Sequence, residues 1–380
     1  MSTLTPTPPP TAPLAGIRVI DFTTVIAGPY CTRLLSDCGA EVIKIETDVG
    51  DQIRHVPPIS DGKSTYFGHL NAGKKSIVLD LRSDEGLAAA KKLVASADVV
   101  VENFRPGVMG RLGLDYATLA AGHEDLIYCA ISGFGQTGPR AKEPAYAPVV
   151  QAGSGLDLAQ MGYQDELTKP EACGIFTADV LSAVYAFGAI QTALISKFRH
   201  GTGQFIDVAL MDAIINLLIY EVQLAQFPDT PPRILYSPSR TNDGFIIITP
   251  ISQKQFVDFA AAIGQPELLD DPRFAVLADR RLHWPQVMEV IDAWTITRSA
   301  KECEAIMTEA GVPSSRYRTV GETMTDAQSQ ARGMMATIQD GAGGYQVPNP
   351  PFKFSDGTVG ITPQVPGLGE HNDELLAELD

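Results

Sequence analysis

The sequence is poor in the residues that build metal centres and disulfide frameworks. Among 380 residues there are five cysteines and six histidines. No two cysteines have the C-x-x-C spacing, and the histidines are scattered at positions 55, 69, 123, 200, 283 and 371. An odd number of widely spaced cysteines argues against a disulfide framework or a structural zinc site, and it favours reduced thiols. We therefore expect no metal site and a cytoplasmic location.

Basic charge is also scarce. The chain has 29 Lys and Arg residues against 45 Asp and Glu residues, which gives a formal net charge of −16. A protein that binds duplex nucleic acid needs a basic surface, so we expect no nucleic-acid partner. If the ligand is itself anionic, its basic contacts must be concentrated in one place.

Several common catalytic and nucleotide-binding motifs are missing. The first strand–turn–helix segment has the turn TTVIAGPYC instead of G-x-G-x-x-G, and Glu46 alone does not make a ribose site. The sequence also lacks H-E-x-x-H, G-x-S-x-G and a Walker loop. These absences argue against a dinucleotide site of the usual kind, a zinc protease and a Ser-His-Asp hydrolase.

The apolar pattern predicts an α/β fold with a parallel sheet. Strands are expected at 17–22, 41–46, 76–81, 98–103, 125–135 and 203–210, and helices at 28–38, 83–97, 178–199 and 211–225. Strands that alternate with helices in this way are typical of a doubly wound, Rossmann-like domain.

The composition changes along the chain and predicts two domains. Residues 1–15 are rich in Pro and Thr and read as a flexible arm. Residues 16–227 and 326–380 are expected to form the large Rossmann-like domain. A Pro-rich stretch at 228–240 leads into a smaller, mostly helical α+β domain, so that 228–325 are assigned to this domain and its linkers. Residues 175–198 are very apolar, but we interpret them as a buried core helix and expect no membrane association.

Asp179 is the unusual residue of that helix. It is the only charge at the head of a long apolar run. One interpretation is a favourable charge–dipole contact in the first turn, with Thr177 or Asp179 near the cap. The other is a carboxylate in a dry pocket that acts as a covalent nucleophile. The residues by themselves leave both open.

Three arginines lie after early strands. Arg82 follows the segment LDL, and Arg105 and Arg111 lie in VENFRPGVMGRLG. Ligands of open α/β sheets bind outside the carboxyl ends of the strands. Each arginine alone could be a solvated loop charge, but together they could hold a phosphate-bearing ligand.

In combination, these segments resemble the class III CoA-transferase family, also called CaiB/BaiF, which includes formyl-CoA transferases and alpha-methylacyl-CoA racemases. The matching stretches are GIRVIDFTTVIAGPYCTRLLSDCGAEVIKIE, KKSIVLDLRSDEG, DVVVENFRPGVMGRLGLDY, ISGFGQTGPRA, FTADVLSAVYAFGAIQTAL, GTGQFIDVALMDA and DDPRF…AGVPSSR. The resemblance covers nearly the whole chain after residue 14.

The resemblance implies an interlocked homodimer, with coenzyme A and acyl-CoA bound as substrates and no permanently bound cofactor. Asp179 would be the nucleophile, which forms aspartyl anhydride and aspartyl-CoA thioester intermediates while CoA passes to a carboxylic acid. The positions that resemble CoA contacts are Ile26, Ala27, Leu79, Arg82, Asn103, Phe104, Arg105, Arg111 and Tyr146.

Departures from the family pattern favour a transferase over a racemase. The racemase motif G-H-D is replaced here by Ala145-Tyr146-Ala147, and a racemase Glu is replaced by Arg240. Proton transfer between two bases would lose both partners of the aspartate. A racemase and a non-catalytic CoA-binding protein remain the alternatives. Arg233 and Arg240 could pair with a second carboxylate of the substrate.

Overall fold

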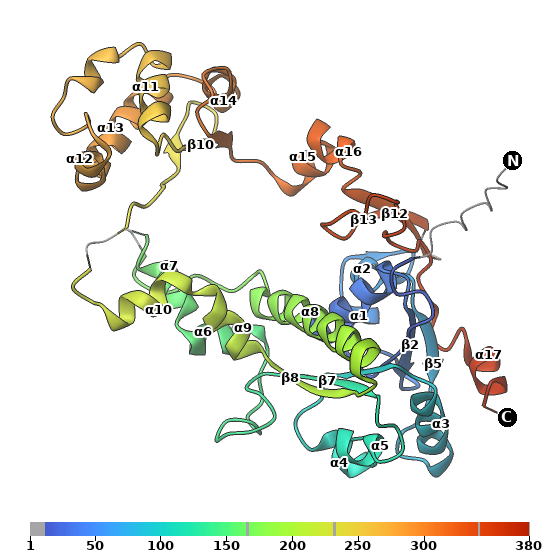
Figure 1. The fold of residues 1–380 in the computed structure, drawn as a ribbon. Helices are drawn as coiled ribbons and strands as arrows, with labels where there is room; N and C mark the ends of the chain where they lie inside the picture. The colour runs from blue at the N-terminus through green and yellow to red at the C-terminus, as the bar shows by residue number, and fades with distance from the viewer. Residues whose placement is uncertain (1–11, 165–166, 231–232, 341–342, 380) are drawn as a thin grey trace, which may run out of the picture. The chain divides into compact units, whose positions relative to one another are not determined.

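The computed structural model describes residues 12–164, 167–230, 233–340 and 343–379. Residues 1–11 of the expected arm and 231–232 of the expected linker lie outside these ranges. The chain divides into two units (Figure 1). The first comprises the residues up to Ala225 together with Gln328–Asp380, and the second comprises Gln226–Ala327.

The first unit is built on a six-stranded parallel sheet, as the sequence predicts. Its strands, in the order β5-β2-β1-β6-β7-β8, are β1 (Arg18–Asp21), β2 (Glu41–Glu46), β5 (Lys75–Val78), β6 (Val99–Glu102), β7 (Ile127–Ser132) and β8 (Gln204–Ala209). After β1 the chain adds β2 and β5 on one side of the sheet, and after β6 it adds β7 and β8 on the other side. The boundary between β1 and β6 is therefore the switch point of the sheet, where open α/β sheets bind their ligands.

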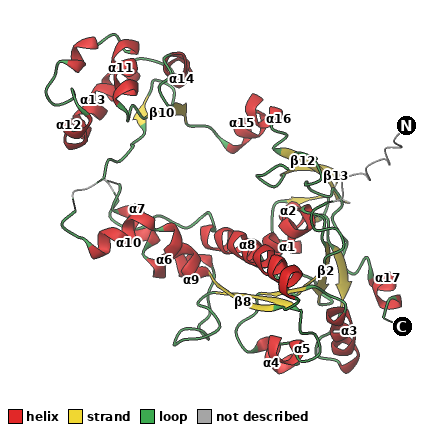
Figure 2. Ribbon diagram, in the orientation of Figure 1, coloured by secondary structure: helices red, strands yellow, loops and turns green. Residues whose placement is uncertain are grey.

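Helices cover both faces of this sheet (Figure 2). Residues of α1 (Ala27–Asp37), α6 (Ala147–Ser154), α8 (Thr177–His200) and α9 (Leu210–Leu217) share one buried cluster with Val19, Val99 and Ile127. Residues of α3 (Asp84–Ala95), α4 (Val108–Leu112), α5 (Tyr116–Ala120) and α17 (Asn372–Ala377) share the other with Ile20 and Val100. Neighbouring strand residues point to opposite faces, so these continuous apolar strands are buried on both sides.

Several smaller elements of the first unit were not predicted. They include α4, α5 and α6 as well as η1 (Gln52–His55), the β3–β4 pair (Ile59–Ser60 and Lys63–Ser64), α2 (Thr65–Asn71), α7 (Leu156–Met161) and the hairpin β12–β13 (Met335–Asp340 and Gly343–Pro348). The helix expected at 211–225 is two helices, α9 and α10 (Ile219–Gln226). They are separated at Leu218, whose ψ of 51° is not helical.

The second unit has a core of its own. Its three-stranded antiparallel sheet, in the order β11-β10-β9, consists of β9 (Ser239–Arg240), β10 (Phe245–Ile248) and β11 (Ser314–Arg316). Phe256, Phe259, Ile291 and Met307 are buried against β10. The helices are α11 (Gln253–Ala262), η2 (Pro266–Leu269), α12 (Leu277–Leu282), α13 (Trp284–Thr295), α14 (Ala300–Glu309) and α15 (Val320–Thr325), and α16 (Ala327–Ala331) follows where the first unit resumes.

Helix α8 is, among the described residues, the one helix long and apolar enough to cross a membrane by length and composition. Such a helix can equally be a core helix of a globular unit. Ala183, Ala186 and Ile190 on one side of α8 are fully buried and share a cluster with residues of β1, β6 and β7. We therefore interpret α8 as a core helix of the first unit.

Candidate active site

A cavity of about 390 Å³ lies at the switch point of the sheet. The loops after β1, β6 and β7 form its wall together with Tyr146, the first turn of α8 and Leu210. Seven of the predicted site residues line it: Ile26, Ala27, Asn103, Phe104, Arg105, Tyr146 and Asp179. Residues that are up to 153 positions apart in the sequence therefore meet at one place.

Asp179 is the third residue of α8 and the acidic residue of its first turn. The preceding cap residue, Phe176, makes no side-chain cap bond, so neither Thr177 nor Asp179 is the N-cap. Burial raises the pKa of the Asp179 carboxyl to about 6. Within the described ranges, no hydrogen bond or ion pair to this carboxylate is present. Desolvation disfavours the charged form of this half-buried carboxylate, so its anion is more reactive toward an electrophile than a solvated one.

The backbone donors at the head of α8 are largely occupied within the protein. The N–H of Ala178 donates to Oε1 of Gln151 over 3.3 Å, and the N–H of Val180 donates to the carbonyl oxygen of Phe176 over 3.2 Å. These donors fix the start of the helix. These two N–H groups are therefore not available to stabilise charge on a substrate beside Asp179.

The loop after β1 has an unusual backbone where it meets the cavity. Val25 has a φ of 70°, in the left-handed region that a β-branched residue rarely adopts. Its N–H donates to Oδ1 of Asp51 over 3.3 Å, and Oδ2 of Asp51 forms a buried ion pair with Lys44 at 3.0 Å. The strained backbone thus has specific partners that stabilise it.

The loop after β6 is fastened in a similar manner. The buried carboxylate of Glu102 accepts a hydrogen bond from the N–H of Phe104 over 2.7 Å. Burial raises the pKa of Glu102 to about 7, although the Phe104 bond opposes this shift. The next residue, Asn103, makes two hydrogen bonds to Thr24 in the loop after β1. The two loops at the switch point are therefore tied to each other.

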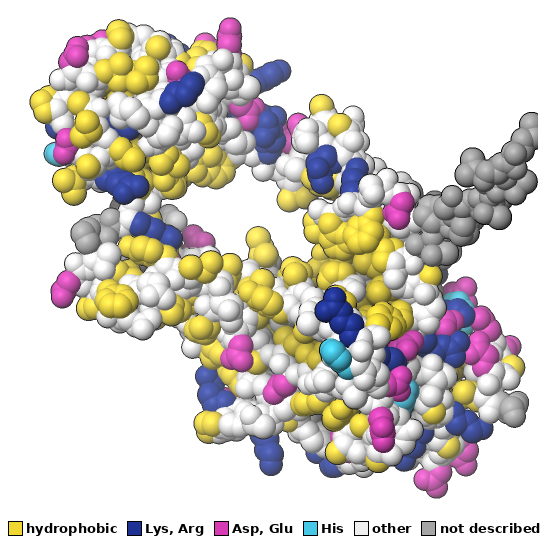
Figure 3. Space-filling model, viewed as in Figure 1, with side chains coloured by type: hydrophobic (Ala, Val, Ile, Leu, Met, Phe, Trp, Pro, Cys, Tyr) yellow, Lys and Arg dark blue, Asp and Glu magenta, His cyan; other side chains and the backbone are white. Residues whose placement is uncertain are grey.

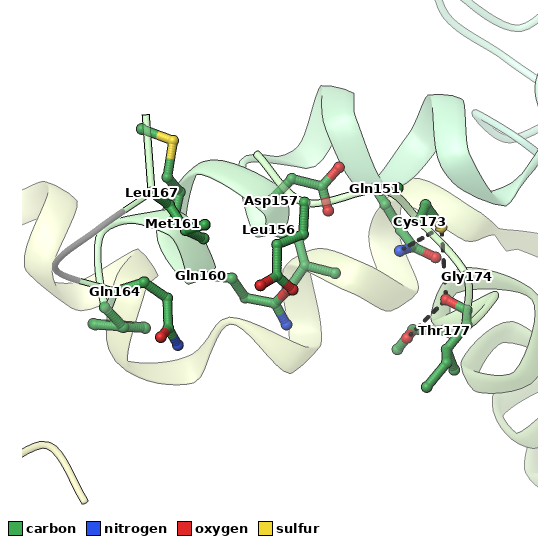
Figure 4. Close-up of a pocket in the computed structure, with 14 residues that line it drawn as sticks. Gln151, Leu156, Asp157, Gln160, Met161, Gln164, Leu167, Cys173, Gly174 and Thr177 are labelled. Carbon is green, nitrogen blue, oxygen red and sulfur yellow. Dashed lines mark hydrogen bonds between the residues drawn. The ribbon is translucent and has the colours of Figure 1, made fainter. Parts of the chain in front are cut away.

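A second cavity of about 450 Å³ adjoins the head of α8 (Figure 4). It is formed by α6, α7 and the segment leading to Thr177. Nε2 of Gln151 donates to the sulfur of Cys173 over 3.2 Å, and that thiol lies 3.7 Å from the carbonyl oxygen of Ile175. Gln151 therefore connects α6, the preceding segment and the first turn that carries Asp179.

Three of the residues predicted to contact CoA do not line the Asp179 cavity. Leu79 is buried in the core after β5. Arg82 has a side chain that is 85% exposed and pairs with Asp80 at 3.1 Å. Arg111 is exposed on α4. Arg240 lies in the second unit, with its guanidinium 5.2 Å from the centre of the Phe245 ring, and Arg233 also belongs to that unit.

Sequence reasoning missed several residues at the site, among them Ser132, Gln52 and Tyr66. Ser132 and Gln52 line the cavity, and Tyr66 lies near enough to Asp179 for the aspartate charge to help raise the pKa of its hydroxyl, after the larger effect of burial. A polar residue at the end of a strand could have signalled Ser132. Tyr66 and Gln52 belong to short elements whose positions the apolar pattern does not predict. In the part of the chain that the structure describes, no cluster of three or more His, Cys, Asp or Glu residues is arranged to hold a metal ion.

Comparison with known proteins places the chain in one family. Residues 14–372 match the model of CoA-transferase family III. The succinate–glutarate CoA-transferase of Agrobacterium fabrum is 35% identical over 97% of this chain and 96% of that protein. The succinyl-CoA–D-citramalate CoA-transferase of Chloroflexus aurantiacus is 34% identical over 97% of this chain and 94% of that protein. The acetyl-CoA:oxalate CoA-transferase of Acetobacter aceti is 35% identical over 91% of this chain and 90% of that protein.

A solved structure agrees with these similarities. The crystal structure of a CAIB/BAIF family protein from Brucella suis superposes with a TM-score of 0.85 at 34% identity, covering 98% of this chain and 100% of that chain. The fold, the family match and the named relatives all lead to the same assignment: the chain belongs to CoA-transferase family III and is a CoA-transferase.

Proposed function

We propose that this enzyme transfers CoA from an acyl-CoA to a free carboxylic acid through covalent intermediates on Asp179. The observation that carries the proposal is the placement of a half-buried carboxylate, with its pKa raised and no cationic partner among the described residues, in the cavity at the switch point. A carboxylate can be both nucleophile and leaving group, as repeated acyl transfer requires.

The proposed reaction has four balanced steps. An Asp179 carboxylate oxygen attacks the thioester carbonyl carbon of the donor, the C–S bond breaks, and a mixed anhydride and CoA thiolate form. The thiolate attacks the Asp179 carbonyl carbon, which releases the first acid and leaves an aspartyl-CoA thioester. The acceptor carboxylate attacks the same carbon and expels the thiolate. The thiolate then attacks the acceptor's carbonyl carbon, which frees Asp179 and gives the new acyl-CoA.

Burial helps this chemistry because both intermediates are sensitive to water. Exclusion of water limits the loss of these intermediates, above all of the reactive anhydride, to hydrolysis. Partial burial of Asp179 in a walled cavity supports a route in which the thiolate stays close by.

The cavity supports a transferase better than a racemase. Where the racemase motif has its His, the chain has Tyr146, which lines the same cavity as Asp179 and is 65% exposed. A phenol hydroxyl does not replace the imidazole base that racemisation by two bases uses. Deuterium incorporation at the alpha carbon of a 2-methylacyl-CoA, without exchange of CoA between acids, would favour the racemase instead. Binding of CoA without turnover of any acid would favour the non-catalytic alternative.

The CoA molecule is proposed to run along the carboxyl edge of the sheet. Asn103, Phe104 and Arg105 would contact it beside the cavity. Leu79 and Arg82 follow β5, and Arg111 lies on α4 farther along the chain after β6. These three residues would contact more distant parts of the CoA molecule. The guanidinium groups would pair with the phosphates of the ligand.

The acids are proposed to be dicarboxylic acids. The names of the three relatives above contain succinate, glutarate, succinyl-CoA, D-citramalate and oxalate. Equal rates with matched mono- and dicarboxylic acids would contradict this part of the proposal.

A homodimer, interlocked as the family resemblance implies, is proposed as the working form. Helix α8 exposes an apolar row, with Val180 43%, Val184 46%, Ile195 52% and Phe198 68% exposed. Figure 3 shows hydrophobic side chains gathered where Figure 1 draws this helix. A large exposed apolar row usually marks an interface. A monomer by light scattering at micromolar concentration would contradict the proposed homodimer.

The five free thiols support a reducing, cytoplasmic location.

An acceptor screen tests the function directly. The enzyme is incubated with succinyl-CoA or acetyl-CoA and each of a series of carboxylic acids, and new acyl-CoA species are measured by mass spectrometry. We expect transfer to at least one dicarboxylic acid by wild-type enzyme and no transfer by Asp179→Ala. Full transfer by Asp179→Ala would overturn the proposal.

A further inference from the structure

We infer that Asp51, together with Lys44, is a positioning residue of the active site. It holds residues 23–25, the loop after β1, in a strained conformation that the loop would not keep by itself. The inference rests on the proposed function, because the loop matters for catalysis only if Asp179 reacts in the cavity that this loop lines.

The strain lies at Val25. Its φ of 70° places a β-branched side chain in the left-handed region, where steric clashes make such residues true outliers. A residue in this conformation persists only when its surroundings hold it. Here Oδ1 of Asp51 accepts hydrogen bonds from the N–H groups of Val25, at 3.3 Å, and Ile53, at 3.1 Å.

The other carboxylate oxygen of Asp51 is linked to Thr23 through Lys44. Oδ2 pairs with the ammonium of Lys44 at 3.0 Å, and both side chains are fully buried. Nζ of Lys44 donates in turn to the carbonyl oxygen of Thr23 over 2.6 Å. A buried ion pair of this kind has a defined geometry, since moving either charge leaves the other uncompensated. One carboxylate therefore fixes both ends of the three-residue loop.

Further side chains hold the remaining backbone groups of the loop. Oδ1 of Asp21 accepts from the N–H of Thr23 over 2.8 Å, and Oδ2 of Asp21 pairs with the buried Lys74 at 2.9 Å. Asn103 holds both the N–H and the carbonyl of Thr24. Each of the three loop residues thus has its own support from another part of the chain.

The held loop leads directly to the reacting group. Thr24, Val25, Ile26 and Ala27 line the cavity that contains Asp179. A misplacement of about 1 Å at a reacting site can cost on the order of 100-fold in rate. Relaxation of Val25 to negative φ would swing the adjoining peptide groups by more than this, so loss of the Asp51 contact should impair transfer.

A double-mutant cycle tests the inference. In Asp51→Asn, the amide oxygen can face the N–H groups of Val25 and Ile53 only by turning its NH₂ group toward Lys44. Glycine adopts a φ of 70° without strain, so Val25→Gly removes the strain that Asp51 opposes. We expect Asp51→Asn to lower kcat/KM by roughly 100-fold in the wild type and by less than about tenfold in the Val25→Gly background. Equal losses in both backgrounds, or no loss in the wild type, would overturn the inference.

Stability must be separated from positioning. The kcat/KM and the unfolding midpoint are measured for each variant. If Val25→Gly restores the kcat/KM of Asp51→Asn without restoring its unfolding midpoint, the result supports positioning. A purely structural role would make the two quantities change together. The matched control is Asp115→Asn, because Asp115 accepts hydrogen bonds from the N–H and hydroxyl of Thr118 away from the cavity; less than a twofold change is expected.

A measurement on the wild type covers the case in which Asp51→Asn does not fold. Amide hydrogen exchange in a peptide covering residues 22–27 should be as slow as in β1. Exchange as fast as in an exposed loop would show that Asp51 and its neighbours do not fix the loop. If wild-type enzyme forms no covalent adduct at Asp179, the proposed function fails while the exchange result still tests the hold. If the adduct forms but the cycle shows no coupling, only the inference about Asp51 fails.

Discussion

Asn103 and Thr24, 79 positions apart, are joined by two hydrogen bonds. The Thr24 N–H donates to Oδ1 of Asn103 over 2.9 Å, and Nδ2 of Asn103 donates to the Thr24 carbonyl oxygen over 2.7 Å. Thr24 follows β1 and Asn103 follows β6, so this pair closes the switch point of the sheet beside Asp179. Asn103 was predicted to contact CoA, and in this structure its amide also organises the loop opposite.

Asn103→Asp should impair transfer. The new carboxylate can still accept from Thr24, but its second oxygen would face the Thr24 carbonyl in place of a donor. We expect kcat/KM to fall by about 10- to 100-fold. Asn349→Asp is the matched control, because Asn349 makes the same kind of bond pair, to Gly333 and Ile361. Similar losses in both variants would show that the Asn103 pair has no special role.

The pH dependence of kcat/KM should report Asp179. Burial raises its pKa to about 6, and only the ionised carboxylate is a nucleophile. Activity should therefore rise as pH increases through about 6 and level off above 7. A rate that is constant from pH 5 to 8, for a substrate whose chemistry limits the rate, would contradict a raised pKa at the nucleophile.

Asp179→Asn should make the inactive protein more stable at high pH. The folded state binds the Asp179 proton more tightly than the unfolded state, whose pKa is near 3.8, so the ionised carboxylate costs stability above pH 6. We expect a gain of about 1–3 kcal/mol at pH 8 from denaturant unfolding. The gain should shrink as pH falls from 6 toward 3.8 and vanish only well below 3.8, where the carboxyl is protonated in both states. A loss of stability at pH 8 would contradict the burial of this group.

Lys74→Met should destabilise the first unit strongly. Lys74 is fully buried and contacts Oδ2 of Asp21 as well as the Thr32 hydroxyl and Asn71 Oδ1. Removal of one partner of a buried pair leaves the other charge uncompensated, at a cost of about 3–5 kcal/mol. The control Lys254→Met removes an exposed pair with Asp258 and should cost less than about 1 kcal/mol. Comparable costs in urea unfolding would contradict the role given to burial.

The arginines should differ in their effect on acyl-CoA binding. Arg105→Ala, beside the cavity, should raise the KM for acyl-CoA by roughly tenfold or more, and Arg82→Ala should raise it as well if its guanidinium binds a phosphate. Arg273→Ala is a matched control for Arg82. Both arginines are exposed and both pair with an aspartate two positions earlier. An equal response to Arg82→Ala and Arg273→Ala would remove Arg82 from the CoA site.

The sequence predicted the frame of the first unit well because its signals are local. Continuous apolar strands and intervening helices gave the parallel sheet. The helix expected at 83–97 is observed as α3, which Ser83 caps and whose first turn contains Asp84 and Glu85. The interruption at Leu218 and the hairpin β12–β13 were missed, because an apolar run does not reveal a break and a short polar hairpin has little periodicity.

The family resemblance, and not a local signal, pointed to Ile26, Ala27 and Asn103 as CoA contacts. These residues follow β1 and β6 and line one cavity in the structure, while their contact with CoA stays a prediction. The contacts of Asp51 with Val25 and of Gln151 with Ala178 depend on tertiary packing between distant segments. Neither a spacing nor a composition in one sequence encodes such pairs visibly.

The most direct test of the account is the mass of the enzyme after rapid mixing with acyl-CoA. Wild-type enzyme, quenched in acid and digested, should carry CoA in thioester linkage on the peptide that contains Asp179. Hydroxylamine should release the label, and Asp179→Asn should not acquire it. Turnover between acyl-CoA and a carboxylic acid at full rate, with no covalent label on that peptide at any time point, would contradict the central claim.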